Sequence, residues 1–225
     1  MSGDLRCLGR TLALHGMLGE AADWAFLGDG VEGADLWEWE VEFERVELGA
    51  NVDAVIGYSM GGRLALHALD QVKAAVIVSA HTGLLTGHHQ RLASDLLWAE
   101  KARTMDWAAF LSEWHAQDVF AGEGFEPDRS RLEPRREAIA AAFDRWSLGR
   151  QSDLLPSLRD VEIPVLWING ATDQRFCKLG AEACAALPRG EHVVLAGCGH
   201  RVPWEAPERF SELIMQFLSR HSLCR

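Results

Sequence analysis

The sequence predicts an α/β protein in which a mostly parallel β-sheet is flanked by helices and carries an inserted helical lid. Short apolar runs alternate with helix-forming segments, which is typical of parallel strands joined by crossover helices. Between residues 81 and 152, in contrast, the pattern is that of long amphipathic helices, with no strand-like run. We therefore expect a core formed by residues 1–80 and 153–225 and a lid formed by residues 81–152.

Five short apolar runs predict buried strands, and helix-forming segments lie between them. The strand candidates are residues 11–14, 52–56, 73–79, 163–170 and 192–195. The core helix candidates are residues 64–69, 177–187 and 207–217. In the lid, the helices are interrupted by Gly122, Gly124, Pro127 and Pro134. Most of the lid tryptophans are expected to pack between its helices.

One further segment has the strict alternation of a half-buried strand. Trp37, Trp39, Val41 and Phe43 alternate with glutamates, so the apolar side would face the core and the acidic side would face water. An irregular or short helical conformation of residues 41–48 is the alternative.

Composition and charge restrict the partners of this protein. A chain of 225 residues with 48% apolar and 24% charged residues has the composition of a soluble globular protein with one core. The net charge of -11 argues against nucleic acids and anionic membranes, so we expect a small-molecule substrate. An anionic substrate would need arginines close to it, because the overall field repels it. We expect a monomer or a homodimer.

Cysteine usage and hydropathy indicate a cytoplasmic protein. The cysteines are odd in number, scattered and without a C-x-x-C pair, so we interpret them as free thiols in a reducing compartment. Residues 1–6 lack the long apolar run of a signal peptide, and no window approaches the length of a membrane span. The five cysteines are Cys7, Cys177, Cys184, Cys198 and Cys224.

A glycine-rich stretch joins the strand candidate at 52–56 to the helix candidate at 64–69. It reads Gly57-Tyr58-Ser59-Met60-Gly61-Gly62-Arg63. A serine between two close glycines at such a joint is typical of a nucleophile elbow, whose strained turn holds the hydroxyl clear of the backbone. The alternative is a glycine-rich turn with an incidental serine, so the interpretation depends on a base and an acid elsewhere in the chain.

His200 is the candidate base and Asp173 the candidate acid, and each lies just after a strand candidate. The carboxyl ends of parallel strands meet at one edge of a sheet, so these side chains are expected to converge on Ser59. His200 would act as the base toward the hydroxyl, and Asp173 would fix the histidine tautomer and stabilise the imidazolium. The other candidate acids, Asp153 and Asp160, precede their strand and are discounted.

The backbone N–H groups of Met60 and Met17 are candidates for an oxyanion hole. Met17 lies in the loop His15-Gly16-Met17-Leu18-Gly19 after the first strand, for which a plain turn is the alternative. Arg63 lies one helical turn after Ser59 and can share its face, where it would grip a carboxylate; an exposed arginine is the alternative.

The remaining histidines carry no motif, and a polar surface role is expected for most of them. They include His81, His88, His89, His115 and His192. Cys198 lies two residues before His200, but one Cys-x-His pair is weak evidence for a metal. No metal site and no cofactor is therefore predicted.

Together these motifs resemble the α/β-hydrolase superfamily, with its serine, acid, histidine order, and within it the 2-succinyl-6-hydroxy-2,4-cyclohexadiene-1-carboxylate synthases of menaquinone biosynthesis. The resemblance runs, with gaps, from about residue 11 to the closing helix. Besides the elbow and its following Leu64-Ala65, the matching residues are His15-Gly16-Met17-Leu18-Gly19, Asp23-Trp24, His81-Thr82-Gly83-Leu84, Arg91, Ser94-Asp95, Trp98-Ala99, Trp114, Gln117, Val119, Phe120, Asp173, Arg175-Phe176 and Gly199-His200.

The resemblance implies a lyase of α/β-hydrolase fold in place of a hydrolase. In that family the serine–histidine pair abstracts a proton from a polycarboxylated substrate, and pyruvate leaves without lasting attachment to the serine. The family's carboxylate-binding arginines correspond to Arg63 and Arg91, and its active-site tyrosine and tryptophan correspond to Tyr58 and Trp114. A third family arginine falls on Arg131, Arg135 or Arg136.

The chain departs from this family in several places. The segment from His15 to Gly57 is short, the usual Gly-His-Gly loop is missing, and the first strands are shortened. His115 stands where many relatives have an aromatic residue, and residues 201–207 are more similar to general hydrolases. A serine esterase, a thioesterase or a C–C bond hydrolase is therefore the alternative function. A non-catalytic ligand receptor is disfavoured by the complete triad.

Overall fold

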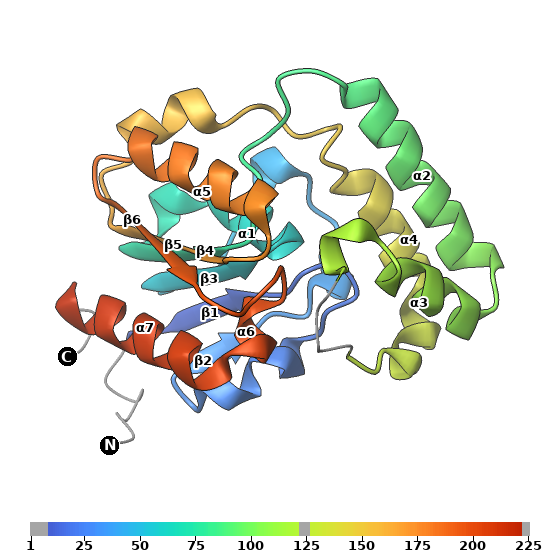
Figure 1. Cartoon of the computed structure of the whole chain (residues 1–225), viewed down its shortest axis with the longest axis horizontal. Coiled ribbons are helices and arrows are strands. Elements are labelled where there is room, and N and C mark those ends of the chain that lie inside the picture. Colours follow the sequence, from blue (N-terminus) through green and yellow to red (C-terminus); the bar gives the residue numbers. More distant parts are fainter. Residues whose placement is uncertain (1–8, 122–126, 222–225) are drawn as a thin grey trace.

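The computed structural model describes residues 9–121 and 127–221 (Figure 1). Six strands form one sheet in the order β2-β1-β3-β4-β5-β6, and every neighbouring pair is parallel. The predicted α/β architecture is therefore confirmed. The strands are β1 Thr11–Leu14, β2 Val31–Gly33, β3 Ala54–Tyr58, β4 Ala74–Val78, β5 Val165–Gly170 and β6 Gly190–Leu195. Cys7, Cys224, Gly122 and Gly124 lie outside the described residues.

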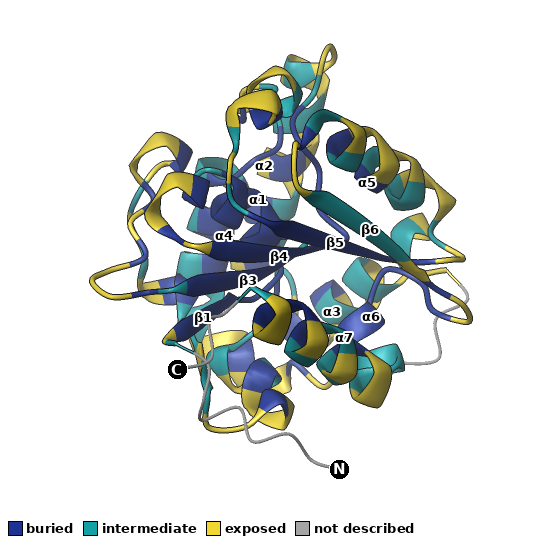
Figure 2. Ribbon diagram, turned by 90° about the vertical axis from the view of Figure 1, so that its left-hand side faces the viewer, coloured by how far each residue is buried: buried dark blue, intermediate teal, exposed yellow. Residues whose placement is uncertain are grey.

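Helices cover both faces of the sheet, because alternate side chains of each strand point to opposite faces. Leu64 of α1 (Met60–Leu66) and Ala183 of α5 (Gln174–Ala186) pack with Val55 on one face. On the other face, apolar residues of α7 (Pro207–Arg220) pack with the 3₁₀ helix η2 (Ala21–Leu27) and with α6 (Val202–Glu205). The central strands are buried throughout, as Figure 2 shows.

Three further α-helices stand to one side of the sheet, next to its carboxyl edge (Figure 1). They are α2 His88–Thr104, α3 Trp107–His115 and α4 Arg136–Arg145. Short 3₁₀ helices accompany them: η6 Asp118–Phe120 and η7 Ser130–Arg135, which contains Pro134. These helices pack onto the core without a break. Their side chains belong to the same apolar cluster as the face of the sheet that packs against α1 and α5, and they include Trp107, Phe110, Phe143 and the following Trp146.

The remaining short elements lie in the core, and some differ from the expected bounds. They are η3 Leu36–Glu38, η4 Phe43–Arg45, η5 Leu69–Gln71 and η8 Leu155–Asp160. Strand β2 and helix α6 were not predicted, because three and four residues are too short to show a period. Helix α5 begins before the expected residue 177, because the Asp173 side chain accepts a hydrogen bond from the Phe176 N–H and caps it. Within residues 9–121 and 127–221, none of the helices is both long and apolar enough to cross a membrane.

The strand predicted at residues 37–43 is wrong. Its carbonyls do not join the sheet but bind α4 and the residue that follows it: Arg145 donates to the Trp39 carbonyl oxygen and the Trp146 indole donates to that of Val41, both at 2.8 Å. Trp37 and Phe43 are buried and Trp39 and Val41 are partly buried, as the alternation predicts, but the backbone forms η3 and η4 instead of a strand. The alternative of a short helical conformation within residues 41–48 is confirmed by η4.

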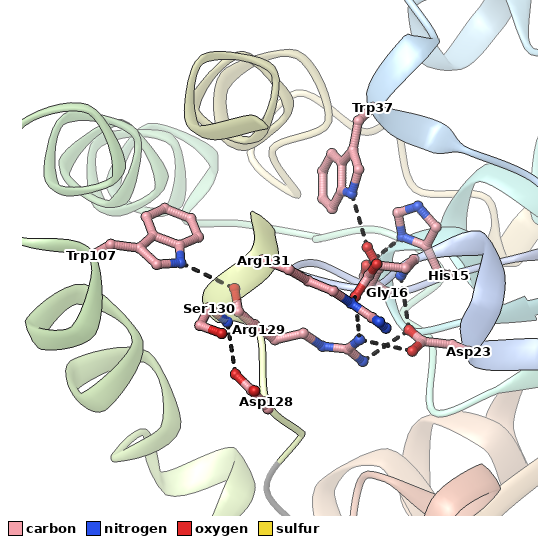
Figure 3. A network of polar contacts seen from close by, with 11 residues as sticks. His15, Gly16, Asp23, Trp37, Trp107, Asp128, Arg129, Ser130 and Arg131 are labelled. Atoms are coloured by element: carbon pink, nitrogen blue, oxygen red, sulfur yellow. Dashed lines mark hydrogen bonds and ion pairs between the residues drawn. The ribbon is translucent and has the colours of Figure 1, made fainter. Parts of the chain in front are cut away.

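His15 directly follows β1 and anchors this irregular segment to the core (Figure 3). Its Nε2 accepts the Leu36 N–H at 3.2 Å, so its proton lies on Nδ1, which donates to the Gly16 carbonyl at 2.8 Å. The ring packs 4.8 Å from Trp37 and is completely buried. Burial is the main cause that lowers the pKa of His15 from 6.5 to about 4.

We expect His15 to make the protein sensitive to acid. Between pH 6.5 and about 4 the unfolded chain binds a proton at His15 that the folded chain does not, so the free energy of unfolding falls as the pH falls. At about 1.4 kcal/mol per pKa unit, the loss from this residue is about 3 kcal/mol. Urea unfolding at a series of pH values measures it.

His15→Gln is the matched variant, because its amide oxygen can accept the Leu36 N–H without titrating. The difference in unfolding free energy between wild type and variant is then expected to shrink from pH 7 to pH 4. Parallel pH profiles for the two proteins would contradict this role of His15.

Candidate active site

The serine lies on a sharp turn between β3 and α1. Ser59 has φ 52° and ψ −109°, a backbone conformation that non-glycine residues rarely adopt. Neighbouring glycines make the turn possible: a Cβ on Gly61 would lie 2.2 Å from the Leu14 carbonyl oxygen, and one on Gly57 would lie 2.6 Å from that of Gly61. The strand, turn and helix therefore have the geometry of a nucleophile elbow.

Gly61→Ala is expected to disrupt this turn. The new methyl group meets backbone atoms of β1 that cannot rotate away, so overpacking should cost about 1–3 kcal/mol of stability and shift Ser59. Urea unfolding and an activity assay measure the two effects. Gly49→Ala is the control, since a Cβ there meets no atom within 4 Å and carries only the strain of φ 83°. Equal losses of activity in both variants would contradict the prediction.

Ser59, His200 and Asp173 form one hydrogen-bonded chain at the carboxyl ends of β3, β5 and β6. His200 Nε2 lies 3.2 Å from Ser59 Oγ, and His200 Nδ1 lies 2.7 Å from Asp173 Oδ2. The other carboxylate oxygen of Asp173 caps α5 by accepting the Phe176 N–H at 3.2 Å. This arrangement places the Nδ1 proton on the aspartate side and leaves the Nε2 lone pair facing the serine, as a general base requires. The acid that reaches His200 is Asp173, whereas Asp153 caps the turn at Leu155.

Packing and one loop contact fix the histidine ring. The Phe176 and Phe120 rings lie 4.6 Å and 5.9 Å from that of His200, and the Glu205 carboxylate accepts the Gly199 N–H at 2.6 Å. Tyr58 lies 5.6 Å from the His200 ring and packs edge-on against Trp204. Tyr58 is buried and does not line the main cavity, although the resemblance implied an active-site tyrosine there. Its ring packs against the His200 ring from the protein interior.

A cavity of about 520 Å³ opens at the Ser59–His200 pair, between the sheet edge and the α2–α4 layer. Met17 and Met60 line it beside Ser59, and Trp114 lines it from α3. Met60 is the first residue of α1, so its N–H has no partner within the helix. The sequence-predicted site residues Ser59, Met17, Met60, Arg63, Arg91, Trp114 and His200 thus share one cavity, and Asp173 lies behind His200.

Arg63 reaches this cavity from inside the protein. It is only 8% exposed, so the alternative of an exposed arginine does not hold. Its guanidinium donates to the Trp146 carbonyl at 2.7 Å and to Gln151 Oε1 at 3.3 Å. Burial, followed by the nearby charge of Arg91, lowers the pKa of Arg63 to about 9, so it still carries its charge at neutral pH.

Arg91 lies on α2 and is held by Asp95 one turn later. Its Nε lies 2.9 Å from both oxygens of Asp95, which also accepts the Ser147 hydroxyl at 2.7 Å. Within residues 9–121 and 127–221, the two Nη groups of Arg91 make no hydrogen bond. Both lie on a guanidinium that lines the cavity, so they are available to a ligand.

The candidates for a third lid arginine bind elsewhere. Arg131 donates to Glu20 at 2.8 Å, and Arg135 pairs with Asp35 at 3.0 Å. Arg136 donates to the Arg103 carbonyl and lies over the Trp107 ring. None of the three lines the cavity.

The model of the alpha/beta hydrolase family matches residues 2–213. The chain belongs to this family. It is 28% identical to the 2-succinyl-6-hydroxy-2,4-cyclohexadiene-1-carboxylate synthase of Pectobacterium atrosepticum, over 92% of this chain and 93% of that protein. The synthase of the same name from Escherichia coli is 32% identical over 61% of this chain and 60% of that protein. These relatives confirm the resemblance and the expectation of an enzyme.

Solved structures show the same α/β-hydrolase fold. MenH from S. aureus has a TM-score of 0.79 and 18% identity, with 94% of each chain covered. A malate-bound thermophilic esterase from Thermogutta terrifontis has a TM-score of 0.72 and 17% identity, with 94% of this chain and 90% of that one covered. At such identities the likeness concerns the fold alone.

Sequence reasoning about this α/β hydrolase missed part of the cavity wall. Ser79, His81 and Arg175 line it, although a surface role was expected for most of the histidines without a motif, and His81 and Arg175 were named only as residues that match the family. The missed signal was position: Ser79 and His81 directly follow β4 and Arg175 follows β5, as Ser59 follows β3. The cavity then carries three arginines against two aspartates, Asp95 and Asp118, in a protein whose net charge is -11.

Proposed function

We propose that this protein is a carbon–oxygen lyase that eliminates pyruvate from a succinyl-enolpyruvyl-cyclohexene carboxylate in menaquinone biosynthesis. The observation that carries the proposal is the placement of Arg63 and Arg91 in the same cavity as the Ser59–His200 pair. A hydrolase of neutral esters needs no such cations, whereas an enzyme that binds a polycarboxylate substrate does. The names of the relatives support the same reaction.

In the proposed reaction, Ser59 and His200 act together as the base. The ring C–H bond breaks, its proton passes through the Ser59 hydroxyl to His200 Nε2, and its electrons form a new C=C bond. The C–O bond to the enolpyruvyl group breaks with its electrons on that oxygen, and protonation of the departing enolate carbon gives pyruvate. Asp173 stabilises the imidazolium between the two proton transfers.

The surrounding groups bind the substrate and its developing charge. Arg63 and Arg91 hold carboxylates through charge-assisted hydrogen bonds, and Trp114 forms an apolar wall beside the ring. The N–H groups of Met60 and Met17 stabilise the negative oxygen that forms as the C–O bond breaks.

The direct test supplies the succinyl-enolpyruvyl substrate and follows pyruvate release with lactate dehydrogenase and NADH. Wild-type protein is expected to release pyruvate, and Ser59→Ala protein is expected to release it far more slowly. Absence of release from protein with a native circular dichroism spectrum would overturn the proposal.

The second candidate is a serine esterase or thioesterase, favoured by the strained conformation of Ser59 and its 3.2 Å contact with His200. That function requires rapid turnover of short p-nitrophenyl esters and covalent labelling of Ser59 by a serine-directed phosphonate. The lyase proposal expects slow ester turnover and a strong dependence of activity on Arg63. Fast ester turnover with no effect of Arg63→Met would favour the esterase.

A further inference from the structure

One wall of the cavity has no role in the reaction described so far. It is formed by four residues that follow two neighbouring strands. Ser79 and His81 follow β4, and Arg175 and Phe176 follow β5. Strands β4 and β5 are adjacent and parallel, so these residues lie at the same edge of the sheet.

Arg175 carries a positive charge in the wall of the cavity. Within residues 9–121 and 127–221 it makes no ion pair and no hydrogen bond, and its guanidinium carbon lies 5.8 Å from the centre of the Phe176 ring. It lines the main cavity and also a second cavity of about 300 Å³. Phe176 and His200 line both cavities as well, so Arg175 lies where the two meet, next to the proposed catalytic base.

His81 presents a neutral N–H donor to the same space. Its Nδ1 accepts the Gly83 N–H at 3.1 Å, so the ring proton lies on Nε2. Burial, with Arg175 as the largest of the charge effects, lowers the pKa of His81 to about 4 and keeps the ring neutral. The ring meets Phe176 edge-on at 6.4 Å, and the Arg175 guanidinium carbon lies 5.8 Å from the centre of the same ring, so His81 and Arg175 share Phe176 as a neighbour.

Ser79 adds a hydroxyl that lacks a partner. The residue is completely buried, has φ 47° and forms part of the cavity wall. Its Oγ makes no hydrogen bond within the described part of the chain. Buried hydroxyl groups are nearly always hydrogen-bonded in folded proteins, so this one is suited to a ligand oxygen.

From this juxtaposition we propose that Arg175, together with the His81 Nε2–H and the Ser79 hydroxyl, binds a third carboxylate of the substrate. The inference rests on the proposed function and makes it more specific. The succinyl, enolpyruvyl and ring portions of the proposed substrate carry one carboxylate each. Arg63 and Arg91 account for two, and the arginines of the lid that were candidates for the third point elsewhere.

The test measures binding and turnover separately. Trimesate, a benzene ring with three carboxylates, is titrated while the fluorescence of the cavity tryptophans is followed. Arg175→Gln is expected to weaken trimesate binding about 10- to 100-fold, the value of one charge-assisted hydrogen bond. It is also expected to raise KM for the succinyl-enolpyruvyl substrate to the same extent with kcat nearly unchanged. The melting temperature should stay nearly unchanged, because within the described residues Arg175 forms no hydrogen bond or ion pair and loses only its 5.8 Å contact with the Phe176 ring.

Lys178→Gln is the matched control. Lys178 lies on the same helix and its loss removes the same charge, but it does not line the cavity. Affinity for trimesate within twofold of wild type in Arg175→Gln, or an equal loss in Lys178→Gln, would overturn the inference.

Two smaller variants test the neutral donors. Ser79→Ala should weaken trimesate binding about 2- to 10-fold without lowering stability, because the hydroxyl makes no hydrogen bond to any of the described residues. His81→Asn, which keeps an acceptor for the Gly83 N–H but removes the Nε2–H donor, should weaken it by a similar factor. Unchanged affinity in both would remove these two residues from the site.

The two proposals can fail independently. If wild-type protein binds trimesate through Arg175 but releases no pyruvate, the carboxylate site stands and the lyase function is wrong. If it releases pyruvate and Arg175→Gln changes neither KM nor trimesate affinity, the function stands and the third site is wrong.

Discussion

Ser59→Ala is expected to lower kcat for pyruvate release by about 10²- to 10⁴-fold, the usual value of a positioned acid–base group, with KM nearly unchanged. The hydroxyl lies 3.2 Å from His200 Nε2 and carries the proton between substrate and base. Substrate affinity is expected to depend on the arginines, so it should survive the loss of the hydroxyl. Steady-state kinetics with the coupled pyruvate assay measure both constants.

The same experiment distinguishes a base from an acylated nucleophile. If Ser59 and His200 act as one proton-transfer unit, His200→Gln should lower kcat by a factor in the same range. The double variant should then be hardly slower than either single variant. A serine that forms an ester intermediate would instead give a burst of the first product before steady turnover. Ser59→Ala with kcat within tenfold of wild type would contradict both mechanisms, and a burst would contradict the lyase.

The three residues of the hydrogen-bonded chain could be placed from the sequence because each carries a local signal. Ser59 lies between close glycines, and Asp173 and His200 each follow a buried apolar run. The parallel sheet then turns chain order into spatial proximity, because the carboxyl ends of β3, β5 and β6 lie at one edge. The local sequence pattern and the topology of the sheet both place these three residues at the same edge, so they could be brought together without knowledge of any tertiary contact.

The prediction failed where partners from the α2–α4 layer determine the backbone. The alternation at residues 37–43 correctly marks the side chains that are buried or partly buried, but the carbonyls of Trp39 and Val41 bind Arg145 and Trp146, more than a hundred positions away. The period of burial alone cannot distinguish a partner strand in the sheet from a partner in the α2–α4 layer. Arg175 matched the family pattern but was assigned no role for a similar reason: only three-dimensional contacts reveal that it lines the cavity and forms no ion pair within the described residues.

Arg129 is the buried charge that joins the segment after α3 to the core (Figure 3). Its Nη1 and Nη2 lie 2.8 Å and 2.9 Å from the two oxygens of Asp23, and Nη1 also donates to Glu20 at 3.1 Å. Its carbonyl accepts the Trp107 indole N–H at 3.0 Å, so the same residue contacts both α3 and the first turn of η2. Its side chain is only 5% exposed and that of Asp23 only 7%, so neither charge is solvated by water.

Arg129→Met is therefore expected to lower the free energy of unfolding by about 3–5 kcal/mol, because it leaves the buried Asp23 carboxylate without its counter-charge. Urea unfolding followed by tryptophan fluorescence measures the loss. Adding Asp23→Asn should restore much of it, since the amide oxygen still accepts the Glu20 N–H that Asp23 now accepts, while the unpaired charge is removed.

Arg131→Gln is the matched control for the Arg129 clamp. Arg131 binds the same Glu20, but its side chain is 65% exposed, so its loss should cost far less stability than the loss of Arg129. If Arg129→Met costs no more than Arg131→Gln, or if Asp23→Asn deepens the loss, the Asp23–Arg129 pair does not hold these segments together. A large loss that Asp23→Asn relieves would instead show that the cost lies in the stranded carboxylate, and that burial gives this contact its strength.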